Sequence, residues 1–321
     1  MSARRHIALA LAISLLVPCT AAVGQEPQQQ PTRRFKSSVS VVSVTAIVRD
    51  RKGRFVKDLA PRDFVIAEAG SPRKILDFRE QSDGPVKLGV LVDASGSMRV
   101  GRKAVDARQA ALHLFSALRN GDEAALFSFD TRLDRVRDFT TDVASLDAAF
   151  EKMNTPYGQT SLFDVIAEAA AVVAEHGRAG GKLPHRSALV VITDGVDTKS
   201  RMLAEQVASA ASAIDIPVYV IAVMAPIDDP RVDETPPFDA NSITQLSRNT
   251  GGEMFTASAP AHASVAARRI VEELRHQYIM AFEASNANGW RPLEVRARDP
   301  KLTVRARTGY SAGASGRPTE H

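Results

Sequence analysis

The chain has 321 residues, of which 44% are hydrophobic and 24% charged, a composition typical of a globular protein long enough for two domains. Its formal net charge of +4 would fall to +2 without Arg4 and Arg5, which is too little to indicate a nucleic-acid partner. Cys19 is the only cysteine. A mature chain that lacks it would have no disulfide framework, no cysteine-based zinc site and no thiol nucleophile.

Residues 1–24 have the features of a secretory signal peptide. Arg4 and Arg5 give a basic start, an apolar run follows, and small residues end the segment at Gly24. The apolar run stops at Pro18, so it is shorter than the roughly 18 to 20 residues of an anchoring helix. We therefore expect cleavage near Gly24, a secreted or periplasmic protein, and no stable membrane span in the mature chain.

The segment after the expected cleavage point, residues 25–37, contains the Gln- and Pro-rich stretch "QEPQQQPTRR". It has no apolar periodicity and is expected to be a flexible linker.

A lipoprotein anchor at Cys19 is a less favoured alternative to a cleaved signal peptide, because Pro18 is a poor fit to the small residue that such sites prefer.

Two segments with alternating apolar and polar side chains flank the middle of the chain. Residues 38–82 alternate from Val42 to Val48, and residues 278–310 alternate in "YIMAFEA", "PLEVRAR" and "LTVRARTGY". Such alternation is typical of antiparallel strands. Each segment is too small to bury much surface alone, so we predict that together they form one small all-β sandwich. Residues 311–321 are expected to be a disordered tail.

The central region, residues 84–277, has a different rhythm. Compact apolar runs such as "VKLGVLVD", "EAALFSFD", "RSALVVITD" and "IPVYVIAVM" alternate with segments of helical spacing such as "SLFDVIAEAAAVVAEHG". Runs of this kind have the length of buried parallel strands. The alternation predicts an α/β domain with a doubly wound, mostly parallel, Rossmann-like sheet.

Oxygen-bearing side chains follow two of the predicted strands. Asp93, Ser95 and Ser97 lie in "DASGSM", directly after the first strand of the central region, and Asp194 ends the strand in "VVITDG". Thr160, in "YGQTSLFD", precedes a predicted helix. Because ligands bind at the carboxyl ends of parallel strands, we expect these five side chains to meet at one edge of the sheet.

This set of two carboxylates and three hydroxyls suits a hard cation. Oxygen donors without imidazole or thiolate favour Mg²⁺, Mn²⁺ or Ca²⁺. Taken singly, each residue has a structural explanation, since Ser-Gly and Asp-Gly are common turn pairs and Thr160 precedes a helix capping box. Their joint placement at one sheet edge is what indicates a metal site.

The five residues resemble the metal-ion-dependent adhesion site (MIDAS) of von Willebrand factor A (VWA) domains. With its flanking strands, the mature chain is similar to a bacterial secreted VWFA-related family of the acidobacterial type. The resemblance implies that Ser95, Ser97 and Thr160 are direct or near-direct metal ligands. It also implies that Asp93 and Asp194 act partly through water, and that a partner carboxylate completes the coordination sphere.

The expected function is therefore a secreted or periplasmic module that binds a protein partner, of unknown identity, through a divalent metal. The main alternative is a structural or assembly scaffold in which the metal only stabilises the loops. No enzymatic activity is expected, because the sequence has no G-x-S-x-G elbow, no H-E-x-x-H motif and no phosphate loop. A metal-dependent hydrolase is a less favoured alternative.

Two segments of the chain are rich in charged residues. In "EVRARDPKLTVRART", the pairs Arg296/Arg298 and Arg305/Arg307 are each expected to lie on the solvent-facing side of a strand. The favoured interpretation is charge that guards an exposed sheet edge, and the alternative is a surface for an anionic envelope component. The segment 224–239 leaves from the same predicted edge as Asp93 and contains five acidic residues. These either rim the metal or belong to a solvated loop.

Overall fold

The computed structural model describes residues 41–81, 84–153, 155–178, 186–224, 240–285 and 288–312. The chain divides into two units, residues 1–38 and 39–321, and all described residues belong to the second. The expected signal peptide, the expected linker, the acidic residues of 225–239 and residues 313–321 therefore lie outside the described part. No helix in the described ranges is long and apolar enough to cross a membrane.

The central region forms a six-stranded sheet in the order β10-β9-β8-β5-β6-β7. All neighbours are parallel except β7, which runs antiparallel to β6 at the edge. The strands are β5 (Lys87–Asp93), β6 (Glu123–Phe129), β7 (Leu133–Thr140), β8 (Ser187–Thr193), β9 (Val218–Val223) and β10 (Met254–Ala257). This arrangement confirms the doubly wound, mostly parallel sheet expected from the sequence.

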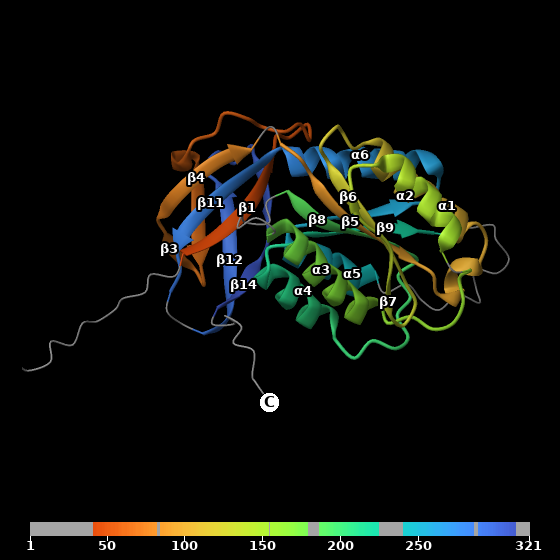
Figure 1. Ribbon diagram of the computed structural model, residues 1–321. Coiled ribbons are helices and arrows are strands. Elements are labelled where there is room, and N and C mark those ends of the chain that lie inside the picture. The colour runs from red at the N-terminus through yellow and green to blue at the C-terminus, as the bar shows by residue number, and fades with distance from the viewer. Residues whose placement is uncertain are drawn as a thin grey trace, which may run out of the picture. The chain divides into compact units, whose positions relative to one another are not determined.

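Helices cover both faces of this sheet (Figure 1). One face packs against α1 (Lys103–Ser116), α2 (Val143–Ala149) and α6 (Pro260–Arg275). The other packs against α3 (Leu162–Arg178), α4 (Ala204–Ala213) and α5 (Ala240–Thr250). Short 3₁₀ helices lie at η1 (Pro61–Asp63), η2 (Gly96–Arg99) and η3 (Phe150–Lys152).

Strand β5 shows why the central strands are apolar throughout. Leu88, Val90 and Val92 face the α1 side, and Leu91 faces the α3 side. Gly89 lets α3 approach closely, since a Cβ at this position would lie 2.4 Å from a methyl group of Val173. Burial on both faces leaves polar side chains only at the two ends of the strand, with Lys87 at its start and Asp93 at its carboxyl end.

The flanking segments form two four-stranded sheets, each with strands from both ends of the chain. The first has the order β13-β1-β11-β4 and the second β14-β12-β2-β3. Their bounds are β1 (Val41–Arg49), β2 (Phe64–Glu68), β3 (Ser71–Arg73), β4 (Ile75–Gln81), β11 (Gln277–Glu283), β12 (Gly289–Ala297), β13 (Thr303–Ala306) and β14 (Gly309–Ala312). Side chains from both sheets share one apolar core, which confirms the predicted sandwich.

The arginines of the C-terminal segment follow the expectation only in part. Arg296 is exposed, with 62% of its side chain accessible, and Arg298 is exposed as well. The expectation is wrong for the second pair, because Arg305 is paired with Glu253 at 2.6 Å and Arg307 is only 6% exposed. These two side chains lie against the α/β domain rather than solvent.

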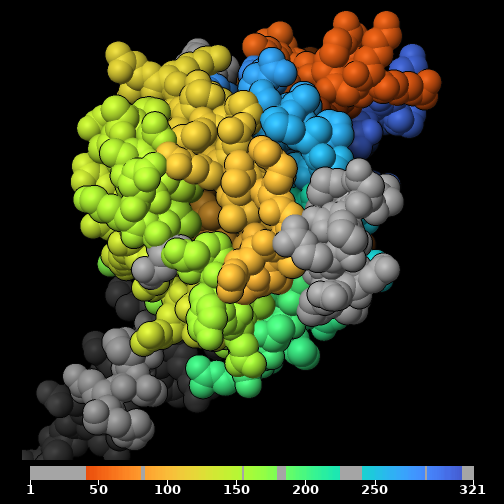
Figure 2. All heavy atoms as spheres, turned by 90° about the vertical axis from the view of Figure 1, so that its right-hand side faces the viewer, coloured from red at the N-terminus to blue at the C-terminus, as the bar shows by residue number. Residues whose placement is uncertain are grey.

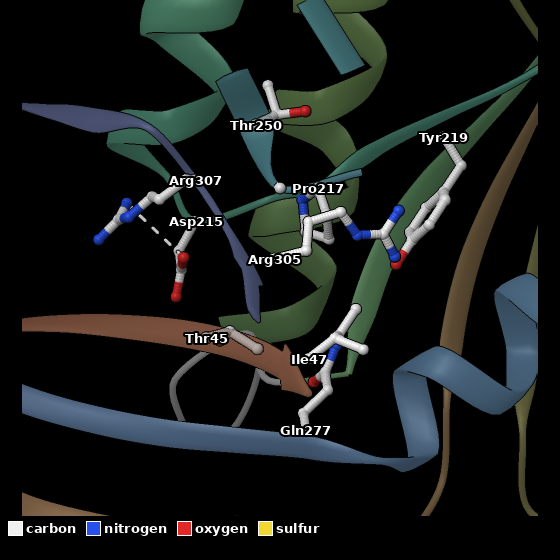
Figure 3. Close-up of a pocket in the computed structure, with 10 residues that line it drawn as sticks. Thr45, Ile47, Asp215, Pro217, Tyr219, Thr250, Gln277, Arg305 and Arg307 are labelled. Carbon is white, nitrogen blue, oxygen red and sulfur yellow. Dashed lines mark ion pairs between the residues drawn. The ribbon is translucent and has the colours of Figure 1, made fainter. Parts of the chain in front are cut away.

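Arg307 donates hydrogen bonds to the backbone oxygens of Ser43 and Ser212 and lies 3.6 Å from a carboxylate oxygen of Asp215. Figure 3 shows this junction, where Arg305 and Arg307 of the sandwich face residues of the α/β domain. The junction encloses a cavity of about 20 Å³, which is room for one water molecule. The strand alternation was predicted correctly, but the side of β13 taken to face solvent is covered.

Candidate metal centre

The loops at the carboxyl ends of β5 and β8 lie on the right-hand side of Figure 1, the face that Figure 2 presents to the viewer. The loop after β5 is fastened to the segment that precedes α3. Gly96 donates its backbone N–H to the carbonyl of Gly158 at 3.0 Å, and Tyr157 donates to the carbonyl of Ala94 at 2.9 Å. A Cβ at Gly96 would lie 3.0 Å from that Gly158 oxygen, so the close approach favours glycine.

Asp93 ends β5 and is only 2% exposed. One carboxylate oxygen accepts the backbone N–H of Ser95 at 2.8 Å, and the other accepts the hydroxyl of Thr193 at 2.5 Å. Burial and the negative charge of Asp194 raise the pKa of Asp93 to about 7, against the hydrogen bonds from Thr193 and Ser95, which lower it. A cation at this site would offset both causes, because it favours the ionised carboxylate.

Ser95, Ser97 and Asp194 form one hydrogen-bonded chain. The Oγ atoms of Ser95 and Ser97 are 3.0 Å apart, and Ser97 Oγ donates to Asp194 Oδ1 at 3.1 Å. Asp194, which follows β8, is 3% exposed and also accepts the backbone N–H of Val196 at 3.3 Å. The structure therefore brings together side chains almost a hundred residues apart in the sequence, on the loops that follow the neighbouring strands β5 and β8.

Thr160 lies on a segment held from both sides. Its backbone N–H donates to Thr198 Oγ1 at 3.0 Å, and its carbonyl accepts the N–H groups of Thr198 and Lys199 at 3.1 and 2.8 Å. Thr198 belongs to the loop after β8, whereas Gly158 is bonded to the loop after β5. Thr160 is thus placed between the loops that carry the other four residues.

The hydroxyl of Thr160 is buried and has no hydrogen-bond partner in the protein. The residue is 1% exposed, and a buried hydroxyl without a partner costs about 1 to 3 kcal/mol. A metal ion would take a lone pair of this oxygen. The orphaned hydroxyl, together with two buried carboxylates and two hydroxyls on the adjoining loops, fits a hard divalent cation.

Two further polar side chains at this centre, Thr193 and Lys103, were not predicted from the sequence. Thr193 binds Asp93, as described above. Lys103, the first residue of α1, places Nζ 2.9 Å from Asp194 Oδ2, and the two side chains are 4% and 2% exposed. A signal for Lys103 was present, because it precedes Ala107, Ala110 and Leu114 at helical spacing and so lies on the buried face of α1.

Other metal chemistry has no site in the described ranges. No three His, Cys, Asp or Glu side chains there come close enough together to hold a metal ion. His176 Nε2 lies 2.6 Å from a carboxylate oxygen of Glu123, and the His176 ring stacks on Phe139. The ring of His276 stacks on Phe55. Binding at the centre would therefore depend on hydroxyl oxygens as well as on Asp93 and Asp194.

Residues 88–196 match the family model of the von Willebrand factor type A domain. The matched range includes Asp93, Ser95, Ser97, Thr160 and Asp194. No curated protein matches the sequence significantly.

Several solved structures are similar to the chain. BatB from Bacteroides thetaiotaomicron is 20% identical, with a TM-score of 0.46, over 59% of this chain and 98% of BatB. A von Willebrand factor type A protein from Catenulispora acidiphila is 11% identical, with a TM-score of 0.48, over 87% of this chain and 76% of its own. Proximal thread matrix protein 1 from the mussel byssus, described with zinc in its MIDAS motif, is 16% identical, with a TM-score of 0.46, over 61% of this chain and 49% of its own.

Proposed function

Because the chain contains a von Willebrand factor type A domain, we propose that it is a metal-dependent binding module of the secreted or periplasmic space. In this proposal a divalent cation, Mg²⁺, Mn²⁺ or Ca²⁺, is held by Asp93, Ser95, Ser97, Thr160 and Asp194. A protein partner then supplies a carboxylate to the coordination sphere. We also assign the chain to the bacterial secreted VWFA-related proteins of the acidobacterial type.

The observation that carries the proposal is the buried hydroxyl of Thr160, which has no partner in the protein. Two buried carboxylates of like charge stand on the adjoining loops. Each of these features costs stability in a protein without a cation. A bound cation would satisfy the hydroxyl and offset the repulsion between the carboxylates.

The chain's own residues have distinct roles in this proposal. Thr193 and the backbone N–H of Ser95 orient the carboxylate of Asp93. Ser97 and the N–H of Val196 orient Asp194. With five protein side chains, two of which act partly through water, and two negative charges at most, the cation keeps room for waters and for an external ligand. We propose no catalytic activity for the chain.

Thermal denaturation with each cation tests metal binding. A ligand that binds only the folded state raises the free energy of unfolding by about 2.7 kcal/mol at a hundredfold excess over its Kd. The melting temperature of the wild type should rise, and that of Asp93→Ala and Asp194→Ala should not. Asp138→Ala, which removes an 83% exposed carboxylate on β7, is the matched control. An equal response of all four proteins would contradict the assignment.

A pull-down from envelope extract distinguishes the binding module from a scaffold whose metal only stabilises loops. Partners that the metal bridges should be captured in Mg²⁺ and released by EDTA. They should also be lost in Asp93→Ala. Partners that remain bound in EDTA to a protein that is still folded would favour the scaffold.

A further inference from the structure

Lys103 brings a positively charged side chain into the candidate metal centre. Its Nζ lies 2.9 Å from Asp194 Oδ2, while Asp194 Oδ1 accepts the hydroxyl of Ser97. The side chains of Lys103 and Asp194 are 4% and 2% exposed. One carboxylate is therefore shared between a residue of the proposed metal site and a buried ammonium group.

The fold fixes Lys103 in this place. It is the first residue of α1 and lies on the helix face that buries Ala107, Ala110 and Leu114 against the sheet. The adjacent Arg102 points elsewhere, since 69% of its side chain is exposed and it lies 3.9 Å from Asp106 at the surface. Lys103 lies six positions after Ser97, so the loop that carries the serines leads directly to the lysine.

The net charge of the metal-loaded site is the sum over Asp93, Asp194, Lys103 and the cation. Two ionised carboxylates and one divalent cation sum to zero. With the ammonium of Lys103 held beside Asp194, the loaded site has a net charge of +1. Because these groups are buried, solvent and salt screen their interactions far less than at the surface.

We propose that Lys103 is a fixed counter-charge that weakens metal binding and makes the loaded site select an anionic partner. The inference rests on the proposed function and names the chemistry of its partner. The ammonium repels the incoming cation and competes with it for Asp194, which lowers metal affinity. The same charge attracts a partner carboxylate, whose arrival returns the loaded site to neutrality.

Coupling between metal and partner is a consequence. A carboxylate that binds better to the loaded site must raise the metal affinity by the same factor, because the linkage is reciprocal. A neutral donor such as an amide or a hydroxyl gains less from the extra charge, because a dipole is attracted by a positive charge more weakly than a carboxylate is. The partner is therefore expected to present an Asp or Glu side chain, or a chain-terminal carboxylate, and to stabilise the metal when it binds.

Calorimetric titration with Mn²⁺ tests the inference. Lys103→Met keeps the length of the side chain and removes its charge, and it should bind Mn²⁺ about tenfold more tightly than the wild type. Lys103→Arg keeps the charge and should resemble the wild type. Arg102→Met removes an exposed positive charge one residue away and should change little, since exposed charges are screened.

The second measurement repeats the Mn²⁺ titrations with sodium acetate in place of sodium chloride at equal ionic strength. Acetate should raise the apparent Mn²⁺ affinity of the wild type, and should raise that of Lys103→Met less. The wild-type response alone tests the coupling if Lys103→Met does not fold, which its circular dichroism would reveal.

The outcomes separate the two proposals. If neither the wild type nor Lys103→Met binds Mn²⁺, both proposals are wrong. If the wild type binds Mn²⁺ and Lys103→Met binds it equally or more weakly, or if acetate has no effect on the wild type, the role of Lys103 is wrong and the metal site stands. Binding by Lys103→Met alone would support the role of Lys103 and overturn metal binding by the natural protein.

Discussion

Arg305 on β13 and Glu273 on α6 form an ion pair that joins the sandwich to the α/β domain. None of the Glu273 side chain is exposed, and it also binds Arg49 of β1 at 2.7 Å and Arg269 of α6 at 3.4 Å. Arg305 in turn binds Glu253 at 2.6 Å. Strands from both ends of the chain are thereby fastened to one buried carboxylate.

Replacement of Glu273 by Gln should lower the free energy of unfolding by about 1.5 to 3 kcal/mol, because Arg49 loses its charged partner and Arg305 keeps only Glu253. Urea denaturation would measure the loss. Glu294→Gln is the matched control, since Glu294 and Arg296 form a surface pair with 60% and 62% of their side chains exposed. That variant should change stability by less than about 1 kcal/mol. Equal effects of the two changes would show that the buried pair does not stabilise the junction.

A second buried carboxylate, Glu68 of β2, should make stability depend on pH. Burial by itself would raise its pKa, but hydrogen bonds from Tyr310 and Ser285 and the charge of Arg73 lower the pKa from 4.5 to about 2. The ionised form is thus favoured by folding. Its contribution is fully present above the unfolded-state value near 4.5 and is lost as pH falls through about 2.

As pH falls from about 4.5 to about 2, protonation of Glu68 should lower the free energy of unfolding of the wild type by about 3 kcal/mol. Glu68→Gln should be less stable at neutral pH, and the difference between it and the wild type should shrink as pH falls. Denaturation at a series of pH values measures this difference directly. A difference that stays constant down to pH 2 would mean that Glu68 has the same pKa in the folded and unfolded states.

Most of the strands and helices were predictable because each of them is determined by its own local pattern, whereas β7, β10, α2 and α5 were not predicted. Continuous apolar runs gave the parallel strands, and period-two alternation gave the sandwich. Which face of an alternating strand is covered depends on elements far away in the sequence. That is why Arg305 and Arg307 were expected at the surface, although α4, α6 and β1 supply their partners.

The candidate site divides in the same way. Asp93 and Asp194 were predictable as neighbours because both end central strands that lie side by side. Ser95 and Ser97 follow Asp93 on one short loop. Lys103 could not be assigned to the site, because helical spacing shows that it lies on the buried face of α1 without showing which carboxylate it meets there.

The sandwich should fold only when both of its segments are present. In each sheet, a strand from the C-terminal segment lies between or beside strands from the N-terminal segment, and β11 pairs with both β1 and β4. Deletion of residues 289–312 removes β12, β13 and β14 and leaves β2 paired only with the three-residue β3. Hydrogen exchange of β1 and β2 amides should then become fast. Retained protection in both strands would show that the N-terminal segment and β11 fold without β12, β13 and β14.

Thr160→Val should have opposite effects on the metal-free and metal-bound proteins. The hydroxyl of Thr160 is buried without a partner, so its replacement by a methyl group of similar shape should leave the metal-free stability unchanged or raise it by about 1 kcal/mol. A cation that uses this oxygen would lose a ligand, and most of the metal-induced rise in melting temperature should disappear. Thr160→Ser is the matched control, because it keeps the oxygen and should keep the rise. Melting curves in EDTA and in saturating Mg²⁺ or Mn²⁺ separate the two effects. If Thr160→Val is strongly destabilised in EDTA, the Thr160 hydroxyl has a structural partner such as a bound water. If Thr160→Val retains the full metal-induced rise in melting temperature, Thr160 is not a metal ligand.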